Sequence, residues 1–323
     1  MKKVLITGCA GFIGSHLVDY LIRKKVDIIG VDNLKTGRLR HIKKNIKKKK
    51  IKFYKIDICN FSSLNKIFKK NKDIDTIFHL AANADVRFGL LKPKKDFRNN
   101  ILATFNLLEC ARINKAKKFI FSSTGSIYGE AISIPTKENA EFPIQTSIYG
   151  ASKLSSEGLI QAYSEGYRIK SYIYRFVSIL GDRYSHGHVY DFFEKLKKNP
   201  NKINVLGDGN QRKSYLNIHD CIRAILLSIS KKNSDISSVY NLGTNEYINV
   251  KQSLKIICNY LKVKPKVSFL GGKRGWVGDN PFIYLSCKKI RKLGWKPKFT
   301  IKDSIIQTLK WLENNNWIFN EKR

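Results

Sequence analysis

The sequence predicts an α/β fold in which a doubly wound parallel sheet is followed by a smaller C-terminal α/β lobe. Two observations support this fold class. Short β-branched runs alternate with amphipathic stretches through the first half of the chain, and the alternation loosens after about residue 176. Repeated βαβ units build a parallel sheet with helices on both faces. Ligands of such sheets bind beyond the carboxyl ends of the strands, so we expect the functional site there.

The individual elements follow from local patterns. The predicted strands share β-branched and aromatic residues and cover 4–7, 27–32, 51–57, 76–82 and 118–123. Segments 12–24 and 99–114 carry apolar residues at i, i+3, i+4 and i+7, which is typical of helices packed on a sheet. A further helical pattern begins at residue 301.

The domain boundaries are predicted from the same change of pattern. Residues 1–176 are expected to form a cofactor-binding domain, completed by about 214–243. Within that stretch, "SYLNIHD" and "VYNLGT" are expected to return to the sheet. Residues 177–213 and 244–323 are expected to form a substrate-binding lobe.

Composition limits the possible partners. The chain has 323 residues, with 61 lysines and arginines against 25 acidic residues, for a formal charge of +36. Apart from "KKNIKKKK" at 43–50, the cations are spread along the chain, and lysine outnumbers arginine, the better reader of phosphates. We interpret the charge as a solvated lysine-rich surface, which makes a nucleic-acid partner unlikely.

Cysteine spacing and hydropathy point to a cytoplasmic protein without a metal. The six cysteines form no C-x-x-C pair and no metal-ligand spacing with histidine, so we expect reduced, packing residues and no metal site. The first apolar run breaks at Gly8, too early for a signal peptide. No stretch approaches the ~18 to 20 apolar residues of a membrane span, and no membrane partner is expected.

A glycine-rich turn predicts a dinucleotide site. Gly8, Gly11 and Gly14 lie between a buried-strand run and an amphipathic helix, where free N–H groups and the helix dipole attract a pyrophosphate. Asp32 follows Gly14 by eighteen residues, at the end of the second strand. A carboxylate there accepts both ribose hydroxyls and repels a 2′-phosphate. The pattern therefore favours NAD over NADP as the cofactor.

The stretch "SIYGASK" places Tyr149 and Lys153 one helical turn apart. A free tyrosine has a pKa near 10 and is a poor base at neutral pH. A neighbouring ammonium stabilises the phenolate, so we expect Lys153 to lower the pKa of Tyr149. Upstream, the predicted strand 118–123 ends in hydroxyl side chains, which can hydrogen-bond a substrate oxygen.

These motifs resemble the extended short-chain dehydrogenase/reductase family, and within it the NAD-dependent nucleoside-diphosphate-sugar epimerases. The resemblance covers nearly the whole chain. Its motifs, in order, are "TGCAGFIG", "VDNL", "KIDI", "HLAANADVR", "SIYGASK", "GDGNQRKSYLNIHD" and "RGWVGDNP". It implies a Rossmann-type fold, bound NAD, a nucleotide-sugar substrate that is expected to be UDP-linked, and a homodimer formed through helices 99–114 and 149–165.

The resemblance also implies residue roles. The catalytic set would be Thr124, Tyr149 and Lys153. The NAD contacts would be Gly8, Gly11, Phe12, Ile13, Gly14, Asp32, Asn33, Asp57, Ile58, Leu80, Ala81, Ala82, Asn99, Ser122, Tyr149 and Lys153. The substrate contacts would be Arg87, Thr124, Ser126, Ser178, His188, Lys213 and Arg274.

The implied reaction is 4-epimerisation of a UDP-sugar through transient oxidation to a 4-keto sugar, in the supply of sugars for polysaccharides. Gly125 and Ser126 stand where 4,6-dehydratases of the family carry Asp-Glu, which argues against dehydration. Other departures affect the substrate lobe. Ser178 replaces an asparagine that is common in 4-epimerases, and Lys213 with Ser214 replaces Arg-Asp.

Three alternatives remain open. A reductase of an NDP-4-keto sugar and an NDP-sugar 2-epimerase share the catalytic set. A reductase must exchange its cofactor at each turnover, whereas an epimerase keeps NAD bound. A non-catalytic NAD-binding or nucleic-acid-binding protein on the same fold is favoured only by the charge, and Tyr149 and Lys153 argue against it.

Overall fold

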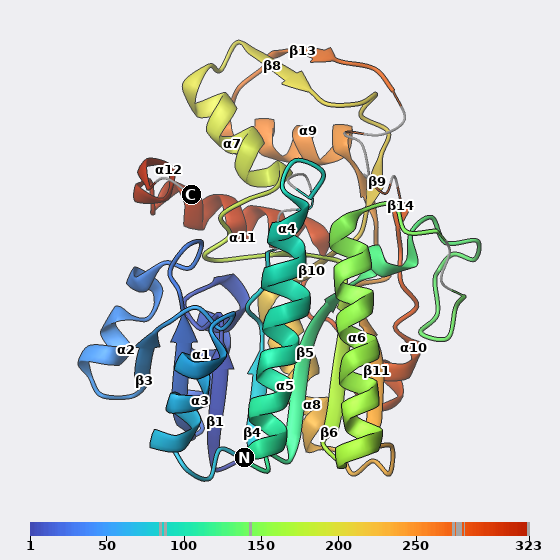
Figure 1. Ribbon diagram of the computed structural model, residues 1–323. Coiled ribbons are helices and arrows are strands. Elements are labelled where there is room, and N and C mark those ends of the chain that lie inside the picture. The colour runs from blue at the N-terminus through green and yellow to red at the C-terminus, as the bar shows by residue number, and fades with distance from the viewer. Residues whose placement is uncertain are drawn as a thin grey trace. The chain divides into compact units, whose positions relative to one another are not determined.

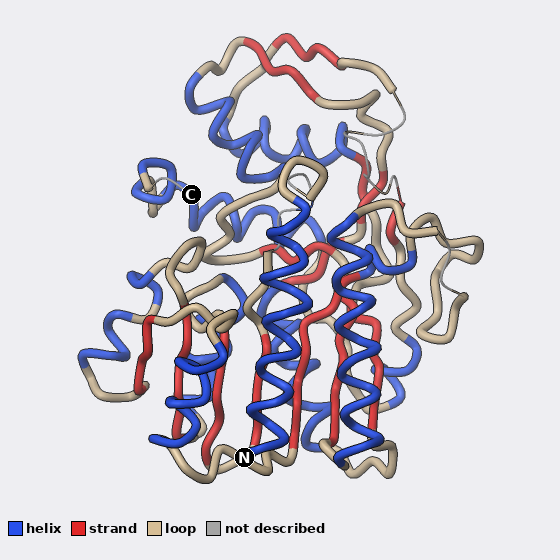
Figure 2. Tube along the Cα trace, viewed as in Figure 1, coloured by secondary structure: helices blue, strands red, loops and turns tan. Residues whose placement is uncertain are grey.

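The computed structural model of the protein describes residues 1–83, 86, 89–141, 144–272, 275, 280 and 282–321. Its largest element is a seven-stranded sheet with the strand order β11-β6-β5-β4-β1-β2-β3 (Figures 1 and 2). The strands are β1 (Lys3–Thr7), β2 (Asp27–Asp32), β3 (Lys52–Lys55), β4 (Thr76–His79), β5 (Lys118–Thr124), β6 (Lys170–Phe176) and β11 (Ser237–Leu242). β1 pairs in parallel with β2 and β4, and β2–β3 and β4–β5 are also parallel. The predicted Rossmann-type parallel sheet is confirmed.

Helices accompany this sheet. They are α1 (Phe12–Arg23), α2 (Lys43–Lys47), α3 (Phe61–Lys70), α4 (Pro93–Asp96), α5 (Ala103–Ile113) and α6 (Ile148–Tyr167), with 3₁₀ turns at Leu39–His41 and Gly125–Tyr128. The longer ones, α1, α3, α5 and α6, each bury part of their surface. α5 and α6 contact each other and run side by side in front of the sheet in Figure 1. Buried residues of α3, α5 and α6 form one core cluster with Leu5, Ile29 and Val31. Burial of this apolar surface supplies the main driving force for folding.

The predicted elements agree closely with the observed ones except at one helix. The segment predicted as a helix over 99–114 begins with a π-helical turn, Phe97–Leu102, before α5. Asn100 lies in this turn, is 1% exposed, and donates to Ser152 Oγ on α6 at 2.8 Å. Such wide turns are frequent at functional sites. Periodicity alone does not predict a local widening that serves a tertiary hydrogen bond.

The chain divides into two compact units. The first contains Met1–Ile127, Ser147–Arg175 and Ile229–Tyr240, and the second contains Tyr128–Thr146, Phe176–Ser228 and Asn241–Arg323. The elements of the second unit are β7 (Ser178–Leu180), α7 (His188–Lys198), β8 (Lys202–Val205), β9 (Arg212–Lys213), β10 (Tyr215–Asn217), α8 (Ile218–Ser230), β12 (Ile248–Asn249), α9 (Val250–Leu261), β13 (Lys266–Phe269), β14 (Phe282–Ile283), α10 (Lys288–Lys292), α11 (Ile301–Glu313) and α12 (Trp317–Asn320).

One expected return to the main sheet occurs and the other does not. The "VYNLGT" segment supplies β11, which pairs next to β6. The "SYLNIHD" segment supplies β10, which pairs in parallel with β7 in a separate two-stranded sheet, so the expectation that it joins the main sheet is wrong. The strand is interrupted at Val177, between the end of β6 and the start of β7, and β10 pairs beside β7, not beside β6.

The remaining composition-based expectations concern cysteines and membranes. All six cysteines are free, and Cys9, Cys110, Cys221 and Cys287 are buried packing residues. Among the helices of the described ranges, none combines the length and the apolar character that crossing a membrane requires.

A buried carboxylate organises the second unit. Asp220, in α8, is fully buried and accepts hydrogen bonds from the N–H groups of Lys298 and Phe299 at 2.9 and 3.1 Å. The Arg223 guanidinium also donates to it, and Trp295 Nε1 donates to its main-chain carbonyl at 3.1 Å. The segment that leads into α11 is thereby tied to α8.

We predict that Asp220→Ala destabilises the second unit by about 3 kcal/mol, because it removes a fully buried carboxylate that two N–H groups and a guanidinium share as acceptor. The free energy of unfolding in urea measures this loss. Asp235→Ala is the control, since Asp235 is exposed, and it should change stability by less than about 0.5 kcal/mol. Equal losses in the two variants would contradict the structural role of Asp220.

Candidate active site

The glycine turn after β1 is as tight as its sequence predicts. Gly8 has φ +70°, in the left-handed region, and a Cβ there would lie 2.8 Å from the main-chain nitrogen of Ala81. A Cβ on Gly14 would lie 2.0 Å from the Gly8 carbonyl oxygen, which accepts the Gly11 N–H at 3.0 Å. Gly11 caps α1 without a side-chain hydrogen bond, and the first turn of α1 carries no acidic residue. Phe12 and Ile13 open this helix. The helix N-terminus can therefore receive an anion.

Asp32 stands at the end of β2 beside this turn. Its carboxylate accepts the Ala10 N–H at 3.0 Å and the Leu34 N–H at 2.8 Å. Burial raises the pKa of Asp32, and these two hydrogen bonds oppose that shift. A Cβ on Gly37 would come within 2.7 Å of the carboxylate oxygens, so glycine keeps the space beside the acid open. Asp32 is thus held in place with unused lone pairs, as a ribose acceptor requires.

Several side chains and one main-chain N–H group surround the carboxylate of Asp57, a predicted NAD contact. Asp57 accepts from Lys35 Nζ at 2.9 Å and from the Cys59 N–H at 3.0 Å, and Asn33 Nδ2 lies 3.5 Å from it. Partial burial alone would raise the pKa of Asp57, but the hydrogen bonds from Lys35 and Cys59 outweigh it and lower the pKa to about 2. The neighbouring Ile58 is buried in the core, and Asn99 Oδ1 lies 3.8 Å from Cys59 Sγ.

A buried threonine and histidine position the segment after β4. Thr7 Oγ1 lies 2.8 Å from His79 Nδ1, and His79 Nε2 lies 3.0 Å from Thr104 Oγ1. Burial, and then the charge of Lys153, lower the pKa of His79 to about 3, so its ring is neutral. The Ala81 N–H donates to Thr7 Oγ1 at 3.3 Å. The segment that begins with Leu80 and Ala81 therefore lies against the glycine turn, and its contact with the cofactor stays a prediction.

The predicted catalytic residues meet at the carboxyl end of β5. Lys153, 1% exposed, donates to the Ser122 carbonyl oxygen at 2.7 Å, and its ammonium lies 4.4 Å from the centre of the Phe121 ring. The side chains of Tyr149 and Thr124 are hydrogen-bonded to each other. Thr124 Oγ1 also lies 3.2 Å from Ser126 Oγ. Tyr149, Thr124 and Ser126 are only half-buried, so a substrate can reach these hydroxyls.

The pKa values differ from the sequence-based expectation. Burial raises the pKa of Tyr149 to about 12, the hydrogen bond with Thr124 opposes this shift, and the charge of Asp96 adds to it. Burial lowers the pKa of Lys153 to about 7, against the opposing charges of Glu157 and Asp96. The expectation that Lys153 lowers the pKa of Tyr149 is therefore not met, because helical spacing gives proximity but not burial.

Several polar residues that sequence reasoning missed lie around this cluster. Asp96 is fully buried and accepts from Asn83 Nδ2 at 2.6 Å, and the Asn83 N–H donates to Asn100 Oδ1 at 2.9 Å. Ser152 Oγ, which accepts from Asn100, donates to the Tyr149 carbonyl oxygen at 2.8 Å. These contacts join α4, the π-helical turn and α6 across 13 to 52 residues of sequence. A single sequence offers no periodic signal for them.

Three predicted substrate residues lie together in the second unit. Ser178 is exposed and pairs in register with Tyr215, whose hydroxyl lies 2.9 Å from His188 Nδ1. His188 Nε2 lies 2.6 Å from Ser253 Oγ, so both ring nitrogens already have partners. Lys213 Nζ donates to the Asn280 carbonyl oxygen. Arg87 and Arg274 lie outside the described residues.

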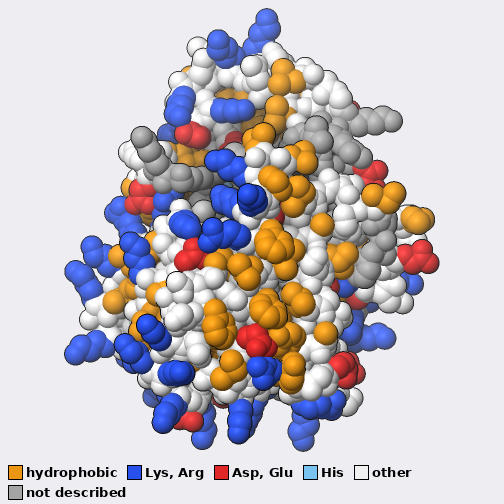
Figure 3. All heavy atoms as spheres, in the orientation of Figure 1, with side chains coloured by type: hydrophobic (Ala, Val, Ile, Leu, Met, Phe, Trp, Pro, Cys, Tyr) orange, Lys and Arg blue, Asp and Glu red, His pale blue; other side chains and the backbone are white. Residues whose placement is uncertain are grey.

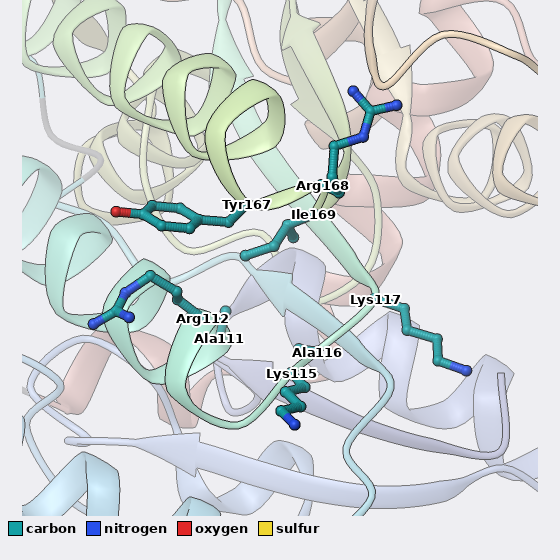
Figure 4. Close-up of a pocket in the computed structure, with 8 residues that line it drawn as sticks. All are labelled: Ala111, Arg112, Lys115, Ala116, Lys117, Tyr167, Arg168 and Ile169. Atoms are coloured by element: carbon teal, nitrogen blue, oxygen red, sulfur yellow. The ribbon is translucent and has the colours of Figure 1, made fainter.

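A surface hollow of about 320 Å³ lies at the other end of the first unit's sheet, where α5 and α6 end and β5 and β6 begin. Figure 4 shows that the side chains of Arg112, Lys117 and Arg168 point away from one another. Arg112 stacks on Tyr167, with 5.3 Å between guanidinium and ring centre, and pairs with Glu109 at 2.9 Å. Cations that point away from one another do not form an anion-binding site, so the candidate active site is the residue cluster at the carboxyl end of β5 and not this hollow.

The residues present fit NAD. The turn leaves no room for a Cβ at Gly8 or Gly14, the N-terminus of α1 is uncapped, and Asp32 is fixed beside it. This donor and acceptor set matches a pyrophosphate followed by an adenosine ribose. The uncompensated carboxylate of Asp32 disfavours a 2′-phosphate.

Comparisons with known proteins identify the family of the chain. The model of the NAD-dependent epimerase/dehydratase family matches residues 4–243. A candidate UDP-glucose 4-epimerase of Methanocaldococcus jannaschii is 35% identical over 319 residues, covering 97% of this chain and 99% of its own. Human dTDP-D-glucose 4,6-dehydratase is 30% identical over 326 residues, covering 98% and 92%.

A solved structure is also similar. It is UDP-glucuronic acid 4-epimerase from Bacillus cereus in complex with UDP-glucuronic acid and NAD, which superposes with a TM-score of 0.88 at 28% identity, over 97% of this chain and 99% of that one. The fold and site define a Rossmann-type enzyme with a tyrosine-lysine pair. The chain belongs to the NAD-dependent epimerase/dehydratase family.

We predict that Gly14→Ala abolishes NAD retention, because its Cβ would overlap the Gly8 carbonyl oxygen and force the turn open. Absorbance and mass analysis of the purified protein measure the bound NAD. Gly158→Ala is the matched control, since a Cβ there meets nothing within 4 Å and the residue lies inside α6. The control should keep NAD and gain roughly 0.5 to 1 kcal/mol of stability. NAD retained equally by both variants would contradict this account of the turn.

Proposed function

We propose that the protein is an NAD-dependent 4-epimerase of a nucleoside-diphosphate hexose, with a UDP-sugar as substrate. The observation that carries the proposal is the meeting of Thr124, Tyr149 and Lys153 at the end of β5, in the same unit as the glycine turn and Asp32. The 4-epimerases among its relatives support the choice of reaction. The UDP-glucuronic acid in the Bacillus cereus complex supports the choice of substrate class.

The chain's own residues divide the chemistry between them. Bound NAD supplies the acceptor and the donor of the hydride. Tyr149 takes the proton of the sugar's 4-hydroxyl group and later returns it, while Thr124 hydrogen-bonds the same oxygen. A pKa of about 12 makes the Tyr149 phenolate costly at neutral pH, so proton removal needs positive charge nearby. Lys153, one helical turn away, provides that charge when it is protonated.

The two units take different tasks in this proposal. The first unit holds NAD, and the second binds the nucleotide sugar through Ser178, His188 and Lys213. His188 would act by orienting Tyr215, since both of its nitrogens have protein partners. Arg212, missed from the sequence, stacks on Phe282 with 4.1 Å between guanidinium and ring centre, beside Lys213. The ammonium of Lys213 would balance the charge of a diphosphate, but without the bidentate hydrogen bonds that an arginine makes.

The relatives include a 4,6-dehydratase, so dehydration is the competing reaction. It needs an acid and a base after Thr124, whereas this chain has Gly125 and Ser126 in the 3₁₀ turn that follows β5. Thr124 Oγ1 instead accepts the Ser126 N–H at 3.1 Å. We therefore favour epimerisation. We also propose that the enzyme works in the cytoplasm in polysaccharide biosynthesis, and that its lysines form a solvated surface.

We predict that the purified protein interconverts at least one pair among UDP-glucose, UDP-galactose and their N-acetyl and glucuronate relatives without added cofactor. Lys153→Ala should reduce the rate by at least ~100-fold, because it removes the cation that lies one helical turn from Tyr149. Product analysis by chromatography or NMR measures the conversion.

Lys48→Ala is the matched control, since Lys48 is exposed in the lysine run. It should leave the rate unchanged. No conversion of any of these sugars would overturn the proposed function. Equal losses for Lys153→Ala and Lys48→Ala would contradict the assigned role of Lys153. Protein that loses NAD and consumes reduced cofactor at each turnover would favour the reductase alternative.

We further propose that the protein is a homodimer that pairs through α5 and α6. Four apolar side chains of this face are exposed, namely Phe97 (57%), Phe105 (41%), Ile113 (46%) and Tyr167 (53%). Figure 3 shows hydrophobic side chains gathered over the middle of the face that α5 and α6 occupy in Figure 1. A contiguous apolar surface rimmed by charge is typical of a protein interface.

We predict that Phe105→Glu halves the mass measured by light scattering, because it places a charge in the centre of that face. Ile132→Glu, at an apolar position that is 89% exposed in the second unit, should leave the mass unchanged. A wild-type protein that runs as a monomer at micromolar concentration would overturn the dimer.

A further inference from the structure

A third charged residue continues the line of Tyr149 and Lys153 along α6. Glu157 follows Lys153 by four residues, so the three side chains lie on one helix face in successive turns. Lys153 and Glu157 are each 1% exposed. The mechanism above uses Tyr149 and Lys153 and leaves this buried carboxylate without a role.

Glu157 connects α6 to two strands. The Arg175 guanidinium of β6 donates to its carboxylate, with Nη2–Oε2 at 2.8 Å and Nε at 3.2 Å from both oxygens. Ser123 Oγ of β5 donates to Oε1. The side chains of the pair are 4% and 2% exposed. A buried ion pair of this kind contributes little net stability compared with apolar packing, so its presence calls for another explanation.

The contacts fix the register between α6 and β5. Three consecutive residues of β5 each meet one of the three aligned side chains. The Ser122 carbonyl accepts from Lys153, Ser123 Oγ donates to Glu157, and Thr124 is hydrogen-bonded to Tyr149. A shift of α6 along β5 would break all three contacts together. Glu157 is further fixed by Arg175, which binds its carboxylate from the neighbouring strand β6.

The same carboxylate acts on the charge of Lys153. Among the described residues, Glu157 on α6 and Asp96 at the end of α4 act on the charge of Lys153, and Lys153 in turn acts on His79 in β4. Tyr149 precedes Lys153 by one helical turn on α6. Arg175 in β6 lies behind Glu157. His79 is neutral, so Glu157 and Asp96 are the groups that favour the ammonium form of Lys153 against its burial.

We propose that Glu157 is a positioning residue of the Thr124–Tyr149–Lys153 site: through Ser123 and Arg175 it holds α6 in register with the end of β5, and its charge keeps Lys153 a cation. The inference rests on the proposed function, since the charge of Lys153 matters to the reaction only if Tyr149 exchanges a proton with the substrate. Glu157 itself touches neither the reacting atoms nor Tyr149 in the hydrogen bonds described above.

The sign of the pH effect follows from Lys153. Its pKa is about 7, and Glu157 opposes the lowering that burial causes. Removal of this negative charge lowers the pKa further, so the ammonium is lost at lower pH. The alkaline limb of the activity profile then moves to lower pH. A purely structural loss would reduce activity at every pH without moving that limb.

The test uses Glu157→Gln, which keeps the shape and removes the charge. Protein labelled with ¹³C at the lysine ε-carbon allows direct titration, because a free lysine side chain has a pKa of ~10 and a lysine that titrates near neutrality is distinguishable from it. The signal that is missing from the spectrum of the Lys153→Arg variant is assigned to Lys153. In Glu157→Gln we expect its midpoint and the alkaline limb of kcat to move together to lower pH, and kcat to fall ~100-fold through the lost register.

Three further proteins complete the design. Glu157→Asp keeps the charge but shortens the reach, so its lysine midpoint should stay near the wild-type value while kcat falls. Glu194→Gln removes a carboxylate paired with Lys198 on the exposed side of α7 and should change neither readout. If Glu157→Gln does not fold, Glu157→Gln combined with Arg175→Met removes the buried cation as well and should show the same shift.

A lysine midpoint in Glu157→Gln that equals the wild-type value overturns the proposal, whatever happens to activity. The titration needs no substrate, so its result is separate from the epimerase assay. A wild-type protein that is inactive on every sugar overturns the proposed function. The lysine titration then decides whether Glu157 keeps Lys153 charged.

Discussion

The ammonium of Lys153 is buried at the carboxyl end of β5, and the polar interior of the first unit is arranged around it. An unpaired ammonium in an apolar setting costs several kcal/mol unless it is hydrogen-bonded and balanced by opposite charge. β5 supplies the Ser122 carbonyl and the face of the Phe121 ring. Two acids balance its charge. Asp96 comes from α4, and Glu157 comes from α6, the helix that also carries Lys153.

Each balancing acid needs partners of its own, and these partners connect the elements of the site. Asp96 draws in Asn83 after β4, and through Asn83 the π-helical turn that carries Asn100. Glu157 draws in Arg175 of β6 and Ser123 of β5. A satisfied buried network specifies one arrangement, because any shift leaves a buried group without its partner. One buried lysine thereby fixes how α4, α6 and three neighbouring strands meet.

The sequence predicted those features that depend on local geometry. β-branched runs gave the strands, glycines gave the turn under α1, and four-residue spacing placed Tyr149 beside Lys153. Features that depend on tertiary contact were missed. Asn83, Asp96 and Arg175 lie in three different segments, and only the fold brings them to one cluster. The predicted lowering of the Tyr149 pKa failed for the same reason, since burial, which spacing does not reveal, raises it to about 12. The pairing of β10 with β7 was likewise missed, because the interruption of the strand at Val177 has no signal in the sequence.

The high pKa of Tyr149 opposes removal of the substrate proton at neutral pH, so the proposed reaction depends on positive charge near the tyrosine. In the proposed epimerisation, the proton that Tyr149 takes from the 4-hydroxyl group is given back to the same oxygen, so a single proton is exchanged. Dehydration would need a second proton path, with an acid for the departing hydroxyl group and a base for the neighbouring carbon. Here the turn after Thr124 carries Gly125 and Ser126, and the Ser126 N–H is already used to hold Thr124. The site is built around one exchangeable proton and one cation, Lys153, whose charge depends on pH near neutrality.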